Sequence, residues 1–395
     1  MTKVIIIGGG IGGLTLAHGL RGAGVDVEVH ERDRHPTDRL HGFRIHINPH
    51  GADALRECLP AGLFTEFTAR SGMGSNEFTF VTERLKRLLR IETGGHYGIN
   101  RIALRQILLS GLDDVVRFDK KFERYTVADD GRVTAHFADG TSAVGDVLVG
   151  ADGGGSRVRG QYLPHAERID TGIIAIAGKY MLTEESRELI PPAFVSGPLS
   201  VLPPKSCGMF TAPHELDGDV QPYVFWAFSA KREYFGTDVE SLGDMELRDL
   251  VLGLTEEWAP PLRGLVALSD VDTISALPIR SATPVPKWEA STITLLGDAI
   301  HSMTPFRGIG ANTALRDAQL LCRKLTEGGR PLVERIAEYE AAMIEYGFAA
   351  VRASLTTARQ SVSDSRTARL AGRAAFRVFD AVPSLKRRAF ADLGR

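Results

Sequence analysis

The feature that most constrains this chain is an apolar run that leads directly into a glycine cluster, VIIIGGGIGGLTLAHGL, at residues 4–20. Residues 3–7, KVIII, are rich in β-branched side chains, which predicts a short buried strand. Gly8, Gly10 and Gly13 then fit the spacing G-x-G-x-x-G, and a helical pattern follows at once. This order predicts a tight turn whose helix points its first N–H groups at a pyrophosphate.

Each glycine of this motif has a separate task. Gly8 permits the turn, Gly10 lets the backbone approach the pyrophosphate, and Gly13 lets the helix pack against the strand. The whole cradle is expected to comprise Gly8, Gly10, Ile11, Gly12 and Gly13. A second predicted strand, DVEVHE, ends at Glu31, whose carboxylate is placed to accept hydrogen bonds from a ribose. Arg32 is interpreted either as a ligand of a 2′-phosphate or as a solvated surface arginine.

A second glycine-rich segment, DVLVGADGGGSRVRG, covers residues 146–160. It predicts a buried strand with Asp152 at its carboxyl end, where ligands bind in parallel sheets, although an ordinary turn stabilised by Asp152 fits the same letters. Upstream, residues 100–112 predict an amphipathic helix with Arg101 in its first turn. The helix dipole disfavours a cation there, so Arg101 is interpreted either as an anion ligand or as a simple exposed arginine.

A third segment, residues 293–325, decides which dinucleotide is bound. Its strand ends at Gly297 and Asp298, and a helix begins near Asn312. An acid at a strand end can bind a polyol hydroxyl, and Gly308 and Gly310 remove side chains where a flat ring must approach. The positive end of the helix suits the flavin edge that gains negative charge on reduction. A nicotinamide dehydrogenase has no need for this second cradle, so the segments together predict FAD.

These motifs, with GADGGGSRVR and GDAIHSMTPFRGIGAN followed by RDA, resemble the class A flavoprotein monooxygenases over about residues 1–350. This family includes the relatives of p-hydroxybenzoate and salicylate hydroxylases. The resemblance implies that Glu31 binds the adenosine ribose and that Arg101 contacts the FAD backbone. It implies that Asp152 is supported by Ser156 and Arg159, and that Asp298 binds the ribityl–pyrophosphate region. The residues implied to bind the cofactor near the isoalloxazine are Pro305, Gly308, Gly310, Ala311 and Asn312.

The chain departs from the family pattern in places. Arg307 stands where many members carry glycine or alanine, and Ile309 stands where many carry glutamine. Arg44 occupies a position that is often glycine, and we count it among the cofactor-binding residues, where it reaches the flavin or its pyrophosphate. His46 is the one catalytic candidate, as a base for a phenolic substrate; the alternative is a merely packed or exposed histidine.

The element pattern predicts an α/β + β fold class in three parts. The first is a Rossmann-type, GR2-like FAD-binding domain with a parallel sheet, from residues 1–75, 94–171 and 283–345. The second is a mostly antiparallel substrate-binding sheet, from residues 76–93 and 172–282, where strand-like runs alternate with Pro and Gly breaks. The third is a set of C-terminal helices from residues 346–395.

For the reaction, the resemblance implies a monooxygenase that uses NADPH or NADH as a transient electron donor, and O2. Oxygen is expected to pass from a flavin C4a-hydroperoxide to a hydrophobic, aromatic or polycyclic small molecule, by hydroxylation or epoxidation. The alternatives are oxidative cyclisation, desaturation or halogenation on the same fold, or a flavin-binding protein without turnover. Pocket walls are expected among Met209, Phe210, Trp226 and Phe228, with the core of the sheet as the alternative place for each.

Composition limits the possible partners. A net charge of −2 gives no sign of a nucleic-acid binder. Cys58, Cys207 and Cys322 show no metal spacing, so we predict no metal site and no disulfide framework, and we expect a reducing cytoplasm. No apolar run reaches the roughly 18 residues of a transmembrane segment, and no signal peptide is apparent. A monomer or homodimer is expected.

Near the C-terminus, basic residues recur at helical spacing: Arg366, Arg369, Arg373 and Arg377. We interpret this face either as a surface for an anionic membrane or a phosphate-bearing partner, or as a solvated or subunit-facing helix.

Overall fold

A computed structural model describes residues 2–36, 38, 44–73, 77–92, 96–215 and 221–390. Contacts divide the chain into two compact units, each assembled from three stretches. Unit 1 comprises Met1–Arg70, Ile99–Ile169 and Arg280–Leu355. Unit 2 comprises Ser71–Gly98, Asp170–Ile279 and Thr356–Arg395. Residues 346–355 belong to unit 1, and residues 356–395 belong to unit 2.

Unit 1 is built on a five-stranded parallel sheet with the order β18-β12-β1-β2-β8. Its strands are β1 (Lys3–Ile7), β2 (Asp26–His30), β8 (Val116–Arg117), β12 (Val147–Gly150) and β18 (Ile293–Leu295). The apolar side chains of β1 are buried on both faces, as expected of a parallel strand covered by helices. The register pairs Ile7 with Gly150, and Gly150 with Leu295, so β1, β12 and β18 end side by side.

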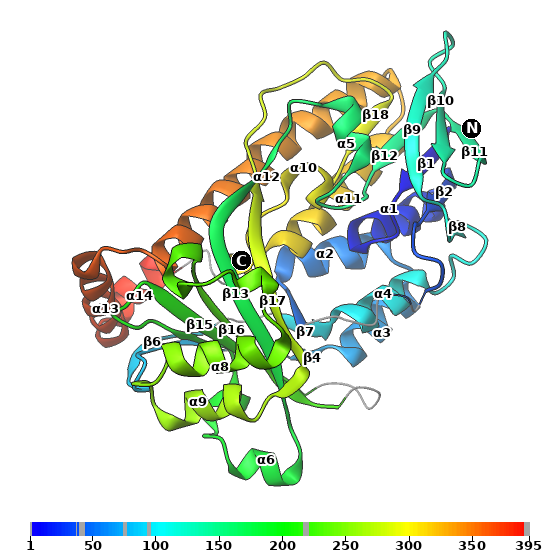
Figure 1. Ribbon diagram of the computed structural model, residues 1–395. Coiled ribbons are helices and arrows are strands. Elements are labelled where there is room, and N and C mark those ends of the chain that lie inside the picture. Colours follow the sequence, from blue (N-terminus) through cyan, green and yellow to red (C-terminus); the bar gives the residue numbers. More distant parts are fainter. Residues whose placement is uncertain are drawn as a thin grey trace. The chain divides into compact units, whose positions relative to one another are not determined.

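Helices pack against this sheet (Figure 1). The helices of unit 1 are α1 (Ile11–Gly22), α2 (Pro49–Cys58), α3 (Ala61–Arg70), α4 (Arg101–Leu109), α5 (Arg157–Tyr162), α10 (Asp298–His301), the 3-10 helix η3 (Pro305–Arg307), α11 (Gly310–Thr326) and most of α12 (Leu332–Ser361). The side chains of Asn48, Asn100 and Ser156 cap α2, α4 and α5 by accepting backbone N–H groups. Helix α1 contacts α2, α4 and α11, which brings helices from both ends of the sequence together beside the glycine motif.

Short strands complete unit 1. An antiparallel sheet with the order β11-β10-β9 is formed by β9 (Phe122–Val127), β10 (Val133–Phe137) and β11 (Ser142–Gly145). Strand β3 (Arg44–Ile47) leads into α2. The chain passes into unit 2 at β4 (Gly72–Met73) and returns within β7 (Tyr97–Asn100).

Unit 2 is built on a seven-stranded sheet with the order β17-β13-β16-β15-β14-β5-β6. Its strands are β5 (Glu77–Val81), β6 (Arg87–Glu92), β13 (Arg168–Met181), β14 (Leu199–Val201), β15 (Cys207–His214), β16 (Tyr223–Lys231) and β17 (Asp270–Ala282). Strand β16 pairs antiparallel with β13 and β15, as β14 does with β15 and β5 with β6, whereas β14 pairs parallel with β5. The mostly antiparallel second sheet expected from the sequence is therefore confirmed.

Alternation along β15 and β16 divides the side chains between two faces of this sheet. One face packs into a hydrophobic core with α8 (Asp244–Leu254) and α9 (Pro260–Ala267). The remaining short helices of unit 2 are α6 (Glu184–Glu188), α7 (Ala193–Ser196), η1 (Arg232–Phe235) and η2 (Val239–Ser241).

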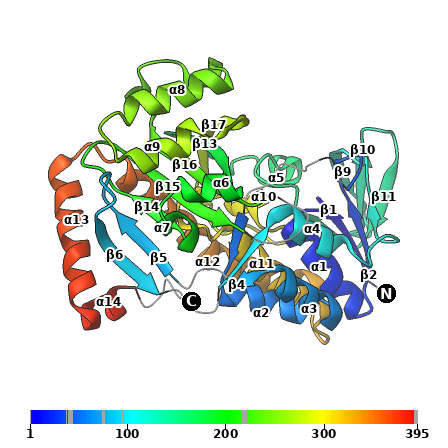
Figure 2. The same cartoon turned by 90° about the horizontal axis from the view of Figure 1, so that it is seen from below.

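The C-terminal helices α13 (Arg366–Ala381) and α14 (Pro383–Ala389) lie beside β5 and β6 (Figure 2). Arg369 donates to the carbonyl oxygens of Pro203 and Cys207, and Arg373 lies 3.3 Å from the carboxylate of Glu83. Two of the four regularly spaced arginines thus contact other segments of unit 2, to which α13 itself belongs. Within the part of the chain that is described, no helix has the length and apolar character needed to span a membrane.

Candidate functional site

The turn after β1 is packed too closely for side chains. Gly8 has a φ of +111°, and a Cβ there would lie 2.4 Å from the carbonyl oxygen of Ala151. A Cβ on Gly13 would lie 2.2 Å from the carbonyl oxygen of Gly8. A Cβ on Gly10, at the N-cap of α1, would meet no atom within 4 Å. Gly8 and Gly13 are therefore required by the fold, whereas Gly10 borders open space into which the first N–H groups of α1 point.

The next two residues connect this turn to the end of β18. Ile11 is the first residue of α1. A Cβ on Gly12 would lie 2.7 Å from the side chain of Leu296, which directly follows β18. The glycine motif thus packs closely against the segments that follow β12 and β18, as well as against the end of β1.

Glu31 follows β2 and is 7% exposed. Its Oε2 accepts the N–H of Gly9 at 2.7 Å, and its Oε1 accepts the N–H of Asp33 at 2.9 Å. The carboxylate therefore fixes the glycine turn from the strand end where ribose binding is predicted. Arg32 beside it is exposed.

Arg105, which the sequence analysis did not single out, completes this part of the site. Its Nε donates to the carbonyl oxygen of Gly9 at 3.2 Å, and its Nη2 lies 3.2 Å from Asp33 and 3.7 Å from Glu31. Arg101, one turn earlier, is exposed at the first residue of α4. Arg101 and Arg105 are four residues apart and so lie on the same face of α4. Only the contacts of Arg105 with Gly9, Glu31 and Asp33 show which of the two joins the glycine turn.

At the end of β12, Asp152 organises the start of α5. Its Oδ1 accepts the hydroxyl of Ser156 at 2.5 Å, and its Oδ2 accepts the N–H of Arg157 at 2.7 Å. Burial raises the pKa of Asp152, against the opposing effect of these hydrogen bonds. Arg159 donates to the carbonyl oxygens of Gly154 at 3.1 Å and Ala299 at 2.8 Å. Arg159 thereby joins the end of β12 to the helix that follows β18.

At the end of β18, Asp298 is exposed as the first residue of α10. The residue before it, Gly297, has a φ of +60° and donates its N–H to Oδ2 of Asp317 at 2.7 Å. The same Oδ2 lies 2.6 Å from Nε2 of His301, and the hydroxyl of Tyr346 donates to Oδ1 at 2.5 Å. Asp317 stands in the RDA motif, but no local pattern places it under the Gly297–Asp298 turn.

The start of α11 is tied to β3. The side-chain amide of Asn312 donates to the carbonyl oxygen of His46 at 2.8 Å, and its Oδ1 accepts the N–H of Asn48 at 2.8 Å. Asn312 therefore acts here as a clamp between two chain segments. Arg44 and His46 alternate with Ile45 along β3 and so share a face of that strand.

The loop before α11 leaves its backbone accessible. Pro305, in η3, and Gly308 are exposed, and Gly308 has a φ of +63°. A Cβ on Gly308 would meet nothing within 4 Å, and one on Gly310 would meet only Met303, at 3.7 Å. Gly310 and Ala311, the first two residues of α11, present their backbone N–H groups at the positive end of a 17-residue helix.

The strand ends of unit 1 therefore converge as a dinucleotide site requires. β1, β12 and β18 are neighbours, and their carboxyl ends carry the open glycine turn, Asp152 and Asp298. This donor set, with an uncovered helix start at Gly10 and an accessible one at α11, fits FAD. Among the described residues, no group of His, Cys, Asp and Glu side chains is arranged to hold a metal ion.

The aromatic residues of unit 2 fall on two faces of its sheet. Met209, Trp226 and Phe228 are at most 2% exposed and belong to the core beneath α8 and α9, the alternative that the sequence left open. Phe210 is half-buried on the opposite face, with ring centroids 6.2 Å from Phe78 and 6.3 Å from Phe225.

Comparison with known proteins identifies the family. The family model for the FAD binding domain matches residues 1–354. The dual O-methyltransferase/FAD-dependent monooxygenase CTB3 of Cercospora beticola is 34% identical over 86% of this chain and 44% of its own length, so the chain spans less than half of that relative. The FAD-dependent urate hydroxylase of Klebsiella pneumoniae is 29% identical over 86% of this chain and 85% of its own length.

A solved structure supports the same assignment. A protein from Photorhabdus luminescens subsp. laumondii TTO1, described as an inferred FAD containing monooxygenase, is 38% identical, with a TM-score of 0.86 over 92% of this chain and 99% of that one. Its fold is thus shared across nearly the whole molecule. Since the family model covers most of the sequence, this chain belongs to the FAD-binding-domain family of the group A flavoprotein monooxygenases, and FAD is its cofactor.

Proposed function

We propose that this protein is an FAD-dependent monooxygenase that takes electrons from NADPH or NADH and transfers one atom of O2 to a hydrophobic small molecule. The observation that carries the proposal is the convergence of three strand ends and the start of α11 in unit 1. The reaction class is supported by relatives, CTB3 among them, that are named as FAD-dependent monooxygenases and match most of this chain.

Bound FAD, once reduced, supplies the chemistry that activates O2. The residues of unit 1 hold and orient it. The N–H groups at Gly10 bind the pyrophosphate, and Glu31 faces the adenosine ribose. Asp298, whose exposed carboxylate has no hydrogen-bond partner within the described residues, accepts hydrogen bonds from the ribityl chain.

The start of α11 and the strand β3 serve the flavin ring. Backbone N–H groups at Gly310 and Ala311 stabilise the negative charge that develops on the ring edge. Arg44 adds a positive charge nearby, because Asn312 holds β3 against the start of the helix. His46, on the same face of β3, accepts a proton from a phenolic substrate.

The substrate is a planar aromatic molecule. Phe78, Phe210 and Phe225 form a cluster of half-buried rings on the sheet face that α8 and α9 leave uncovered. Relatives named for urate and for 6-hydroxynicotinate support a flat ring as the reacting group. Of the four expected wall residues, Phe210 is the one that we propose for substrate contact.

Anaerobic and aerobic experiments test this function separately. Purified protein is titrated with NADH or NADPH in the absence of O2 and with candidate aromatic compounds present, and bleaching of the flavin band is followed. After O2 is admitted, a product heavier by 16 mass units, with label from 18O2, is expected. A loss of 2 units indicates desaturation, a gain of 34 indicates chlorination, and an unbleached flavin with every compound indicates a protein without turnover. Each of these results contradicts oxygen insertion.

A further inference from the structure

Two cysteines from distant parts of the sequence meet in the interior of unit 1. Cys58 is the last residue of α2, and Cys322 lies in α11. Both sulfur atoms face Gly19 of α1: a Cβ built on Gly19 would lie 2.7 Å from the sulfur of Cys322 and 3.3 Å from that of Cys58. The two sulfur atoms therefore lie against the same position of α1. Gly19 thus leaves a gap in the helix packing that the sulfur pair fills.

The two thiols differ in their surroundings. Cys58 is 6% exposed, whereas Cys322 is half-buried. The neighbouring Cys58 thiol lowers the pKa of Cys322, against the opposing effects of burial and of the Glu57 carboxylate, and the Arg323 guanidinium acts in the lowering direction. The neighbouring Cys322 thiol, together with burial, raises the pKa of Cys58. A half-buried thiol with a lowered pKa beside a buried thiol with a raised pKa is the arrangement of an attacking and a resolving cysteine.

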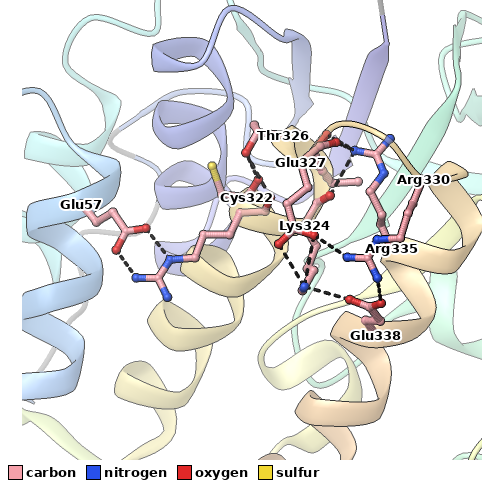
Figure 3. Close-up of polar contacts among 10 residues, drawn as sticks. Glu57, Cys322, Lys324, Thr326, Glu327, Arg330, Arg335 and Glu338 are labelled. Atoms are coloured by element: carbon pink, nitrogen blue, oxygen red, sulfur yellow. Dashed lines mark hydrogen bonds and ion pairs between the residues drawn. The ribbon is translucent and has the colours of Figure 1, made fainter.

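Solvent reaches this end of the helix pair. A groove of about 750 Å³ lies between α2 and α11, and Glu57 and Arg323, the immediate neighbours of the two cysteines, line it. Figure 3 shows Glu57 and Cys322 on the two neighbouring helices. Nε of Arg323, the residue after Cys322, donates to the Glu57 carboxylate at 2.6 Å. The polar contacts around Cys322 therefore already join the two helices whose thiols meet.

We propose that Cys58 and Cys322 are a reversible redox pair that closes to a disulfide under hydrogen peroxide. The Cys322 thiolate attacks one peroxide oxygen, so that an S–O bond forms while the O–O bond breaks and hydroxide leaves. The Cys58 sulfur then attacks the Cys322 sulfur: the S–S bond forms, the S–O bond breaks, and the hydroxyl departs with the Cys58 proton as water. The hydroxide from the first step takes up the proton that Cys322 lost on ionisation. Two electrons thus pass from sulfur to peroxide, and two water molecules are produced overall.

The disulfide clamps two helices that frame the cofactor site. At their other ends α2 and α11 are already joined, since Asn312 accepts the N–H of Asn48. With a covalent link between Cys58 and Cys322, α2 and α11 would be joined at both ends. Because the link also restricts the unfolded chain, the thermal midpoint of the oxidised protein is expected to rise by roughly 2–5 °C.

Peptide mapping of the purified full-length protein tests the pair. Reduced protein is treated with a small excess of hydrogen peroxide, and free thiols are counted before and after. The count is expected to fall from three to one, with a peptide pair linked through Cys58 and Cys322 that dithiothreitol separates. Three persisting thiols, or irreversible oxidation of Cys322 without the linked peptide, would overturn the proposal.

Variants assign the two roles. In Cys58→Ser, the Cys322 sulfenic acid has no partner and is expected to be trapped by dimedone. In Cys207→Ser, a matched control at a buried cysteine of unit 2, the disulfide is expected to form as in the parent protein. Absence of dimedone labelling in a folded Cys58→Ser protein, loss of the disulfide in Cys207→Ser, or an unchanged midpoint on oxidation contradicts the mechanism as stated. Should Cys58→Ser not fold, mapping of the parent protein decides alone.

Discussion

Replacing Asp317 with alanine should destabilise unit 1 more than any change at the exposed acids of the site. The carboxylate is 0% exposed and accepts three hydrogen bonds, from Gly297, His301 and Tyr346. Asp317→Ala removes the charge in direct contact with the His301 ring, which is also fully buried. It also leaves a backbone N–H and a phenol hydroxyl facing a cavity.

The size of the effect follows from these losses. Breaking a buried ion pair by removing one partner costs about 3–5 kcal/mol. Since a whole protein is stable by only about 5–15 kcal/mol, this loss is a substantial part of the total stability. Asp317→Asn keeps the volume and one carbonyl oxygen, so we expect roughly half the loss, on the order of 2 kcal/mol.

Denaturant unfolding followed by tryptophan fluorescence and circular dichroism measures both variants. His301→Gln and the double variant complete a cycle, and we expect the double variant to lose much less than the two single losses combined, because the pair acts as one unit. A folded Asp317→Ala protein within about 0.5 kcal/mol of the parent would refute the reasoning, because surface substitutions alone have effects of that size.

The same pair gives a pH dependence. Burial alone would lower the pKa of His301, but the Asp317 carboxylate more than offsets it, so the pKa is raised above 6.5. A raised histidine pKa means that the folded state binds the proton more tightly than the unfolded state. The stabilisation is therefore complete below pH 6.5 and is lost as the pH rises through the folded-state pKa. In His301→Gln this part of the pH profile should be flat.

Three further outcomes are expected. Gly10→Val should abolish FAD retention, measured by absorbance in the flavin band, while the unfolding midpoint of the apoprotein stays near that of the parent; Gly13→Ala, whose Cβ would meet a carbonyl oxygen, should lower that midpoint as well. Asp298→Ala should weaken FAD by about 1–3 kcal/mol in a binding titration, and an unchanged dissociation constant would remove Asp298 from the site. Burial raises the pKa of Glu340 to about 7 despite the hydrogen bond from Thr294, so the folded state favours the protonated acid and stability should fall as the pH rises from 4.5 to 7. In Glu340→Gln that fall should disappear, and a decline of equal size would contradict the assignment.

The sequence predicts well those elements that short runs of consecutive residues define. Buried strands of β-branched residues followed by glycine, as at β1 and β12, have few alternatives, and the third segment, residues 293–325, then identifies the cofactor. Which face of the second sheet carries a given aromatic side chain is harder to predict. Alternation shows only that Phe210 and Trp226 each point to the face opposite their neighbours in the strand. Which face packs on α8 and α9 depends on helices whose position no local pattern encodes.

Contacts between distant segments were the least predictable. Arg101 and Arg105 differ by one helical turn, and their sequence surroundings give no reason to prefer Arg105 as the partner of Glu31 and Asp33. Cys58 and Cys322 likewise stand apart in the sequence, without a spacing that signals a pair. Their proximity follows from the packing of α2 and α11 on α1, which only the assembled unit defines.

The hydrogen bonds of the three acids at the strand ends separate folding from cofactor binding. The carboxylate oxygens of Glu31 and Asp152 accept hydrogen bonds from backbone N–H groups and a hydroxyl of the same chain. Removing either carboxylate therefore changes the structure of the turn as well as any contact with a ligand. Asp298 is exposed and is held from behind, through the bond between Gly297 and Asp317. A carboxylate fixed in position and still able to accept hydrogen bonds is preorganised for a polyol. Cofactor affinity should therefore depend most specifically on Asp298, the acid that contributes least to the fold.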